Sequence, residues 1–423
     1  MRFSQKAAHI VDGKLTGSPL LSDPKLRLVF EALDGEGEEL RVVGGAVRNA
    51  LLGEDIADVD LATTALPEVI LARAAQARLR TIPTGIEHGT ITVLVDGAPF
   101  EVTTLRQDID TFGRHATVEF GRDFAADAHR RDFTINALSL DARGHVHDYC
   151  GGLADLAVRC VRFIGDASER IREDYLRILR LFRFHAAYGE GEIESEALQA
   201  SIANRGGLEI LSRERIRAEL LKLLVARGAA ECTQAMAECG ILQRLVAGVP
   251  VAARLRRMEA LEAQRGGTPD AILRLGALLV FVEEDAVRLR DWLRLSNAEE
   301  TRLANAARAL VELHAREKPP LPNDLYRFLF LHGRRAALDA ILLAHSESRA
   351  AAGDLQWASA FNFLHDTPEP RMPFSGGDLV KRGIQPGPAL GTMLKNLQAA
   401  WIRAGFPREP DVLARLLEEA SWK

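Results

Sequence analysis

The sequence predicts an α/β domain of about 140 residues, followed by a long part built from helices. Up to about residue 140, short runs of β-branched and apolar residues alternate with turn residues and helical stretches. After about residue 165, apolar residues recur at spacings of three and four, as at Leu176, Leu179 and Phe182. The chain has 423 residues, of which 47% are hydrophobic and 27% charged, so it can bury sizeable cores. This composition excludes disorder as the main state of the chain.

Four strands and two helices are predicted in the α/β part. The strands cover residues 40–43, 59–62, 90–95 and 100–104. Asp96 and Gly97 separate the last two strands and predict a tight hairpin, because both residue types tolerate a positive φ. Helical stretches at 46–52 and 67–77 lie between the strands, which makes this part α/β.

Helices are predicted throughout the remaining sequence. The first of them runs from about Ile171 to His185. Breaks between helices are predicted at clusters of Gly and Pro, namely 189–191, 206–207, 266–267, 319–322 and 368–373. Near the end, the segment Gly383–Gly391 predicts a tight turn with a helix starting near Pro388. Two roles stay open for this turn, a contact with RNA or a plain connection between helices.

The charge and cysteine content limit the possible classes of protein. There are 54 Lys and Arg against 59 Asp and Glu, which gives a net charge of −5. A nucleic-acid ligand would therefore have to meet clustered basic groups. The four cysteines form no C-x-x-C pair, so neither a disulfide framework nor a zinc ribbon is indicated. Without an 18-residue apolar run, we expect a soluble, cytoplasmic protein with no membrane contact, and no protein partner is indicated.

A Gly-Gly pair marks the end of the first predicted strand and the start of a helix. Backbone N–H groups at Gly44 and Gly45 can approach a phosphate closely, and Arg48 would lie in the first helical turn as its charged partner. A tight strand-to-helix turn without a ligand is the alternative.

Three acidic residues predict a metal-dependent catalytic site. Asp58 and Asp60 lie two residues apart at a predicted strand, which would point both carboxylates to one side. Two like charges this close require a cation, and carboxylate oxygens suit Mg²⁺. Glu101 lies among apolar and β-branched residues of the strand 100–104, where an inward carboxylate also needs a cation or a role as a base. The alternatives are an exposed acidic turn and an edge-strand Glu101 that faces water.

These carboxylates predict two-metal phosphoryl transfer, with Asp58, Asp60 and Glu101 as catalytic residues and the two aspartates as metal ligands. The motifs also resemble a known family. Gly44-Gly-x-Val-Arg48 with Leu51-Leu-Gly53, followed by Asp58-x-Asp60 and Thr63, is similar to the signature of class II tRNA nucleotidyltransferases and bacterial poly(A) polymerases, within the polymerase β superfamily. The similarity continues in Arg130-Arg-Asp-Phe-Thr-Ile-Asn-Ala-Leu138, Glu173-Asp174-x-x-Arg177-x-x-Arg180-x-x-Arg183-Phe184 and Ser212-x-Glu214-Arg215-Ile216. Asn49 stands where the family usually has Asp, and we expect this neutral substitution to leave the metal pair intact.

The resemblance implies a nucleotidyltransferase head with a polymerase β-like mixed sheet and helices, followed by an all-helical neck, body and tail. Residues 1–140 would form the catalytic head, 141–225 the neck with nucleotide-selecting and RNA-binding helices, and 226–423 a body and tail that bind tRNA. The family also implies that Arg131 helps to bind the nucleotide and that Asn136 supports its loop. A surface ion pair between Arg131 and Asp132 is the alternative. The predicted nucleotide-binding residues are Gly44, Gly45, Arg48, Arg131, Asp132, Asn136, Asp174, Arg177, Arg180 and Arg183.

Asp174 and Arg177 predict nucleotide selection by protein side chains. With Arg180 and Arg183 they follow three-residue steps, which would place all four on one stripe of a helix. An ionised Asp only accepts hydrogen bonds and an Arg only donates them, so one such pair can satisfy the edge of cytosine or adenine. Uracil and guanine present a carbonyl where the Asp needs a donor. Arg180 and Arg183 would contact triphosphate or ribose, or else form ion pairs that stabilise the neck.

The resemblance therefore implies an enzyme, a Mg²⁺-dependent CCA tRNA nucleotidyltransferase. Such an enzyme adds C, C and A to tRNA lacking its 3′ CCA, from CTP and ATP, without a nucleic-acid template and with release of diphosphate. A poly(A) polymerase is the nearest alternative, disfavoured by the net acidic charge and the lack of a basic C-terminal extension. A noncatalytic RNA-binding relative is disfavoured by the intact acidic residues, and an enzyme for small molecules or proteins by the long helical region.

Overall fold

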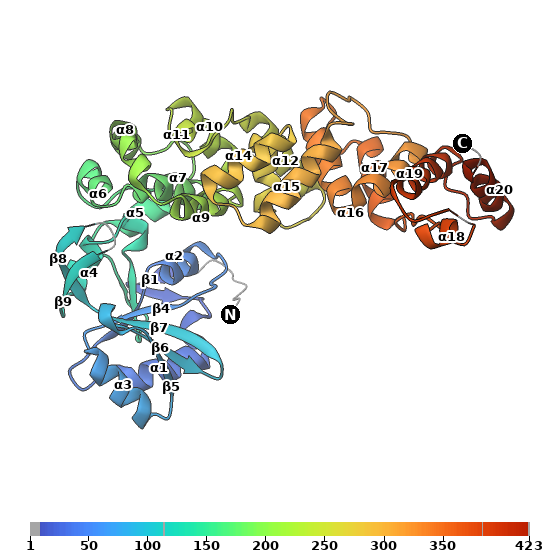
Figure 1. The fold of residues 1–423 in the computed structure, drawn as a ribbon. Helices are drawn as coiled ribbons and strands as arrows, with labels where there is room; N and C mark the ends of the chain where they lie inside the picture. The colour runs from blue at the N-terminus through green and yellow to red at the C-terminus, as the bar shows by residue number, and fades with distance from the viewer. Residues whose placement is uncertain (1–8, 113–114, 383, 422–423) are drawn as a thin grey trace. The chain divides into compact units, whose positions relative to one another are not determined.

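The computed structural model describes residues 9–112, 115–382 and 384–421. The chain divides into two compact units, the first made of residues up to Gly228 with Glu238–Arg244, and the second of Ala229–Ala237 with the residues from Leu245 on. A mixed sheet and helices form the first unit, and the described residues of the second unit form helices and their connections (Figure 1). The predicted order, an α/β head followed by a helical part, is confirmed.

The head is built on a sheet of seven strands. Across the sheet the order is β11 (Val146–His147), β10 (Ser139–Asp141), β3 (Leu40–Val43), β4 (Asp60–Thr63), β7 (Ala98–Thr104), β6 (Thr90–Val95) and β5 (Arg80–Gly85). Strands β4 and β7 pair in parallel at the middle of the sheet, and the other neighbours are antiparallel. Strands β10 and β11, which lie at and after residue 139 in the chain, form one end of this sheet.

The strands predicted from the sequence form the centre of this sheet. All residues of β3 are buried, and it lies between β10 and β4. Asp96 and Gly97 join β6 to β7 with φ values of 46° and 77°, the tight turn that the Asp-Gly pair predicts. Seven strands of the described residues were not predicted from the sequence, namely β1 (His9–Val11), β2 (Lys14–Thr16), β5, β8 (Arg106–Phe112), β9 (His115–Phe120), β10 and β11.

Helices pack against the sheet and connect its strands. Helices α1 (Pro24–Leu33) and α3 (Pro67–Gln76) contact each other and β6. Helix α2 (Gly45–Leu52) follows β3 directly, and α4 (Phe124–His129) precedes the short 3-10 turn Thr134–Asn136. Leu26, Val29 and Ile70 are buried on the faces of α1 and α3, as expected for amphipathic helices that cover a sheet.

The neck consists of short helices that belong to the same unit as the head. They are α5 (Gly152–Ala157), α6 (Ala167–Glu173), α7 (Leu176–Tyr188), α8 (Ser195–Asn204) and α9 (Arg213–Leu224). The predicted continuous helix from Ile171 to His185 is wrong, because α6 ends at Glu173 and α7 begins at Leu176. Asp174 lies in the break with an extended backbone (φ −153°, ψ 104°), and its Oδ1 accepts a hydrogen bond from the N–H of Leu176 at 3.1 Å. This local side-chain bond competes with a continuous helix.

The second unit contains the remaining helices. They are α10 (Ala229–Glu238), α11 (Leu242–Leu245), α12 (Ala252–Gln264), α13 (Ala271–Leu279), α14 (Glu283–Leu293), α15 (Asn297–Leu310), α16 (Pro322–Glu347), α17 (Leu355–Asp366), α18 (Gly376–Val380), α19 (Pro388–Arg403) and α20 (Pro410–Ser421). The first residues of α10 and the last of α11 belong to it, while Glu238–Arg244 belong to the first unit. Helices α12, α13, α15, α16 and α17 share one apolar core around Phe328 and Trp357.

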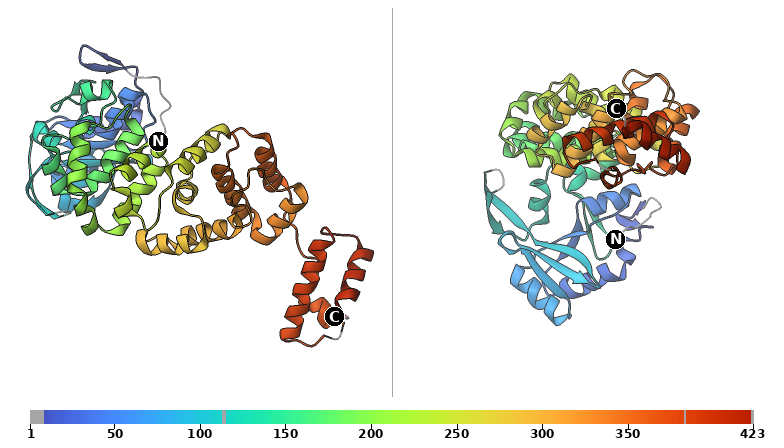
Figure 2. Two further views of the ribbon diagram at one scale, coloured as in Figure 1. Left: turned by 90° about the horizontal axis from the view of Figure 1, so that it is seen from above. Right: turned by 45° about the vertical axis from the view of Figure 1, so that its right-hand side comes forward.

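The three last helices have a core of their own, formed by Phe374, Leu379, Leu397, Trp401 and Leu416, and they gather into a separate bundle (Figure 2). Helix α19 begins at Pro388, as the Gly and Pro pattern predicts, whereas Gly383 of that motif lies outside the described residues. No helix in the described part of the chain is both long and apolar enough to cross a membrane.

Candidate active site

The Gly-Gly pair forms the predicted turn between β3 and α2. Gly44 has φ 67° and ψ −122°, a conformation that favours glycine, and its N–H donates to the carbonyl of Leu138 at 3.0 Å. A methyl group on Gly44 would lie 3.0 Å from Nη1 of Arg131. The turn thus brings the start of α2 close to a second arginine-bearing segment, and both glycines line a pocket.

Arg48 is the buried centre of the interactions on α2, with only 5% of its surface exposed. Its Nη1 donates to Oδ1 of Asn136, its Nη2 donates to the hydroxyl of Tyr188 at 2.8 Å, and its guanidinium lies over the Tyr188 ring at 3.8 Å. Asn49 accepts from Nε and Nη2 of Arg48 and donates through Nδ2 to the carbonyl of Asp55 at 2.8 Å. A carboxylate at position 49 has no N–H group and could not donate this last bond. The amide of Asn49 therefore helps to hold the loop before β4.

The three predicted catalytic carboxylates come together at the start of β4. Asp60 is the first residue of the strand and is in register with Glu101 on the parallel strand β7. Asp58 lies before the strand begins. The two aspartates therefore do not share a strand, contrary to the prediction. The pKa of Asp60 is raised, first by desolvation and then by the negative charges of Glu101 and Asp58, while Arg131 opposes the shift. The charges of Asp58 and Glu101 therefore both act on Asp60.

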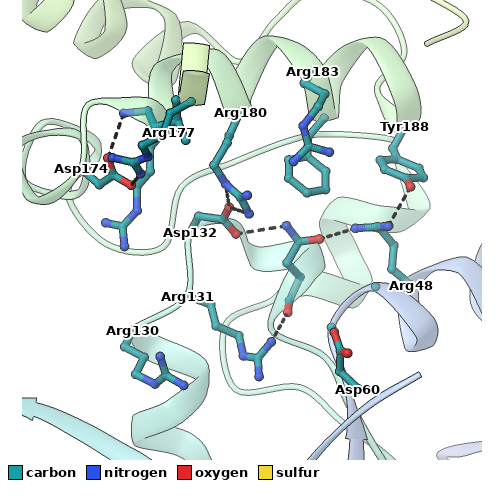
Figure 3. A pocket seen from close by; sticks show the side chains of 16 residues that line it. Arg48, Asp60, Arg130, Arg131, Asp132, Asp174, Arg177, Arg180, Arg183 and Tyr188 are labelled. Atoms are coloured by element: carbon teal, nitrogen blue, oxygen red, sulfur yellow. Dashed lines mark hydrogen bonds and ion pairs between the residues drawn. The ribbon is translucent and has the colours of Figure 1, made fainter. Parts of the chain in front are cut away.

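A pocket of about 490 Å³ contains the predicted nucleotide-binding residues. All ten of them line it, namely Gly44, Gly45, Arg48, Arg131, Asp132, Asn136, Asp174, Arg177, Arg180 and Arg183, together with Asp60 (Figure 3). Asp58 and Glu101 are not among its lining residues in the described part of the chain. Seven arginines and three aspartates line the pocket, so it suits a ligand with several negative charges.

A chain of buried polar side chains crosses the pocket from the head to the neck. Asn136 accepts from Arg48 through Oδ1 and donates through Nδ2 to Oδ1 of Asp132 at 3.1 Å. Oδ2 of Asp132 then accepts from Nε of Arg180 on α7 at 2.7 Å. Figure 3 shows the two ends of this series, the bond between Tyr188 and Arg48 and the bond between Asp132 and Arg180. Asn136 therefore does more than support a loop, because it fixes two charged residues of opposite sign.

The pKa of Asp132 is lowered in the folded protein. Burial alone would raise this pKa, but the charge of Arg180 and the hydrogen bonds from Asn136, Arg180 and the Phe133 N–H outweigh it. A group with a depressed folded pKa stabilises the protein above its unfolded pKa, about 3.9 for Asp, and this contribution is lost as the pH falls through the folded value.

We expect this carboxylate to make a measurable contribution to acid sensitivity. Asp132→Asn should lower the free energy of unfolding at pH 7, because it removes the charge that pairs with Arg180. The difference from wild type should be constant above about pH 5 and shrink below about pH 4. Urea denaturation across this range measures it. A difference that stays constant down to about pH 3 would contradict the assigned pairing.

Arg131 forms its ion pair with Asp127 and not with Asp132, the acid considered from the sequence. Its Nε and Nη2 donate to Oδ2 of Asp127 on α4 at 3.1 and 3.0 Å, and Arg130 also binds Asp127. The alternative of a surface pair between Arg131 and Asp132 is therefore wrong. Nη1 of Arg131 points toward the pocket near Gly44 and lies 3.5 Å from the carbonyl of Asn136.

Asp174 and Arg177 both line the pocket, although they do not share one helix. Oδ2 of Asp174 accepts from Nη2 of Arg215 at 2.6 Å, while Nη1 of Arg177 donates to Glu173 and, at 2.7 Å, to the carbonyl of Arg170. A carboxylate has about four acceptor positions, so Asp174 keeps capacity for a further donor.

Arg180 and Arg183 combine the two roles left open by the sequence. Each forms an ion pair, Arg180 with Asp132 and Arg183 with Glu219 on α9 at 2.5 Å, and each also lines the pocket. The guanidinium of Arg183 lies 4.1 Å from the centroid of the Phe184 ring.

The sequence analysis missed five residues that line the pocket. They are Arg130, Leu176, Phe184, Tyr188 and Arg215. Arg130, Phe184 and Arg215 lie within or at the end of motifs noted in the sequence, so motif position was an available signal for them. Tyr188 offered no such signal, because its role follows from its contact with Arg48 across the neck.

Comparisons with known proteins agree with this geometry. Residues 40–162 match the family model described as the poly A polymerase head domain, and residues 192–252 match that described as a probable RNA and SrmB-binding site of polymerase A. The mitochondrial CCA tRNA nucleotidyltransferase 1 of Mus musculus is 34% identical over 400 residues, which cover 93% of this chain and 90% of the relative.

Two further similarities come from bacterial proteins. The CCA-adding enzyme of Limosilactobacillus fermentum is 34% identical over 376 residues, or 88% of this chain and 90% of the relative. The crystal structure of the Bacillus stearothermophilus CCA-adding enzyme in complex with CTP is similar with a TM-score of 0.74 at 28% identity, over 94% of this chain and 98% of that chain. The predicted family and fold class are confirmed. The chain therefore belongs to the family of CCA-adding tRNA nucleotidyltransferases, enzymes that share the poly(A) polymerase head domain.

Proposed function

We propose that this protein adds C, C and A to the 3′ end of tRNA, taking CTP and ATP without a nucleic-acid template and releasing diphosphate. The observation that carries this proposal is the similarity to CCA-adding relatives along about nine tenths of the chain, in both head and helical regions. The arginine-rich pocket beside Asp60 supports it, because that pocket suits a nucleoside triphosphate. A poly(A) polymerase is not favoured by these relatives.

We further propose Mg²⁺ as the metal, bound by Asp58 and Asp60. The donor set fits a divalent cation, since carboxylate oxygens are hard ligands, and burial together with the negative charges of Glu101 and Asp58 raises the pKa of Asp60. Among the described residues no three His, Cys, Asp or Glu side chains form a complete metal site, so phosphate and water oxygens would supply the remaining ligands. When bound, Mg²⁺ would neutralise phosphate charge and favour ionisation of the 3′-hydroxyl.

The residues of the chain itself divide the remaining work. Glu101, opposite Asp60 on β7, is proposed to accept the proton of the tRNA 3′-hydroxyl or to bind the metal. Arg131 and Arg180 are proposed to contact the triphosphate, because Asp127 and Asp132 hold their guanidinium groups at the pocket. Asp174 and Arg177 are proposed to read the Watson–Crick edge of the base, where the carboxylate accepts from the amino group of cytosine or adenine.

The helical regions are proposed to bind the tRNA. The match of residues 192–252 to a family model described as a probable RNA-binding site supports this role for α8, α9 and the helices that follow them. The division into a head of residues 1–140, a neck of 141–225 and a body and tail of 226–423 remains a proposal. So does the cytoplasmic location, since the mouse relative is described as mitochondrial.

The proposed function predicts controlled length. A tRNA that ends before CCA should gain C, C and A and then stop, because the folded tRNA and the growing end together fill the space at the pocket. An unstructured RNA should be a poor primer, and binding of tRNA should weaken steeply with salt. Primer extension with each NTP separately and with all four, resolved on a sequencing gel, measures the products. Long adenosine tails on unstructured RNA with ATP alone would favour a poly(A) polymerase instead.

A further inference from the structure

Tyr175 packs directly on the backbone of Gly207. Gly207 lies in a single stretch of 3-10 helix, Arg205–Ile210, between α8 and α9. A methyl group built on Gly207 would overlap the Tyr175 ring at Cδ1, Cε1 and Cγ. The neighbouring Gly206 faces open space, with no atom within 4 Å of the same position. Gly207 therefore occupies a place that no larger residue can take while Tyr175 keeps its position.

The chain that continues from this 3-10 helix into α9 also contacts Asp174, the residue before Tyr175. Beyond the 3-10 helix, α9 carries Arg215, whose Nη2 donates to Oδ2 of Asp174 at 2.6 Å. Asp174 and Tyr175 are the two residues between α6 and α7. The turn is thus held at two points by residues 205–215, at the Tyr175 ring by Gly207 and at the Asp174 carboxylate by Arg215.

We propose that Gly207 is a positioning residue for nucleotide selection, acting through Tyr175 on Asp174. This inference rests on the proposed reading of the base by Asp174. Asp174 lines the pocket, whereas Tyr175 and Gly207 are not among its described lining residues. Any influence of Gly207 on the bound base would therefore pass through the turn that contains Asp174 and Tyr175.

The transmission follows from covalent geometry. To accept a methyl group at Gly207, either the Tyr175 ring rotates away or the 3-10 helix moves outward. The first change removes the contact that holds the turn at Tyr175 and so frees the backbone at Asp174 to move, and the second shifts the start of α9 and therefore Arg215. Both displace the Asp174 carboxylate, and a hydrogen bond to a base edge weakens steeply with small changes in distance and angle.

Gly207→Ala is the test variant, and Gly206→Ala is its matched control. Gly207→Ala should lower kcat/KM for CTP and ATP by about 10- to 100-fold, as expected for a displacement of about 1 Å. It should also raise the share of UTP and GTP incorporated into tRNA ending before CCA, with the KM for tRNA unchanged. Gly206→Ala should behave as wild type in each of these measurements, because its methyl group meets no neighbour.

A double variant separates the proposed route from a general loss of stability. In a Tyr175→Ala background the methyl group at position 207 no longer meets a ring, so adding Gly207→Ala should cause little further change. A purely structural role would instead lower incorporation of all four nucleotides in proportion and leave their ratio unchanged. If Gly207→Ala alone does not fold, Tyr175→Ala must still relax selectivity, since it removes the ring without adding bulk.

Unchanged nucleotide ratios in Gly207→Ala, or a further loss of similar size when Gly207→Ala is added to Tyr175→Ala, would overturn the inference. Failure of the proposed function is a different outcome, because wild type and Gly206→Ala would then themselves fail to complete CCA on tRNA.

Discussion

Asp60→Ala should lose nucleotide incorporation by about a thousandfold or more, while the head stays folded. Asp60 lies where β4 begins, in register with Glu101, and its pKa is raised by desolvation and by the negative charges of Glu101 and Asp58. Removing it relieves repulsion within the protein and removes one of the two proposed metal ligands. Single-turnover addition of CTP to tRNA lacking CCA measures the loss, and thermal denaturation measures the folding.

Asp55→Ala is the control for this experiment, because its exposed side chain lies in the same loop and only its backbone carbonyl is used, by Asn49. It should retain incorporation. Glu101→Gln should also be damaging, since it removes the candidate base while keeping the shape of the side chain. Near wild-type incorporation by Asp60→Ala with Mg²⁺ would show that the assigned metal site is wrong.

Asp174→Ala should lower kcat/KM for CTP and ATP by roughly 5- to 150-fold, equivalent to about 1 to 3 kcal/mol for one lost base contact. Exclusion of UTP and GTP should relax, because the acceptor that disfavours their carbonyl groups is gone. Arg177→Ala should weaken use of CTP and ATP by a similar factor, since it removes the donor. Competition between the four nucleotides on one tRNA primer measures both effects.

Asp174→Asn makes the test sharper than alanine does. The amide can still accept from Arg215, and it adds an N–H donor that a carbonyl of uracil or guanine can accept. Its selectivity should therefore shift toward UTP or GTP instead of merely weakening. Arg172→Ala, at an exposed position on α6, is the control for Arg177→Ala and should leave selectivity unchanged. Unchanged selectivity in a variant without both Asp174 and Arg177 would place the selecting groups elsewhere.

The central strands and the pocket residues could be predicted from the sequence because their signals are local. The Asp96-Gly97 turn and the apolar run of β3 depend only on neighbouring residues, and the predicted nucleotide-binding residues that line the pocket fall within three short motifs, 44–48, 131–136 and 174–183. Periodicity failed at Asp174, since a three-residue spacing of charged residues continues through the break between α6 and α7. The Asp174 side chain accepts a hydrogen bond from the N–H of Leu176 at the break between the helices, but the spacing of charged residues gives no sign of this break.

Other features could not be predicted because they depend on contacts between distant segments. Asp132 directly follows Arg131 and Asp127 lies four residues before it, and the fold selects the more distant Asp127. Arg215 meets Asp174 across 41 positions, and Tyr188 meets Arg48 across 140. The contact of Gly207 with Tyr175 could not be predicted either. A Gly-Gly pair in the sequence indicates a break between helices, but it does not indicate which of the two glycines packs against an aromatic ring.

The parallel pairing of β4 with β7 has a consequence for how the enzyme becomes active during folding. Asp60 and Glu101 belong to adjacent strands, but α3, β5 and β6 come between them in the chain. Parallel strands cannot be joined by a tight turn, so this contact forms only after a long loop has closed, which is a slow step. Sheet closure also has to work against the mutual repulsion of the carboxylates. A nascent chain that has emerged only as far as β6 therefore has its Gly-Gly turn and both aspartates, but no catalytic centre.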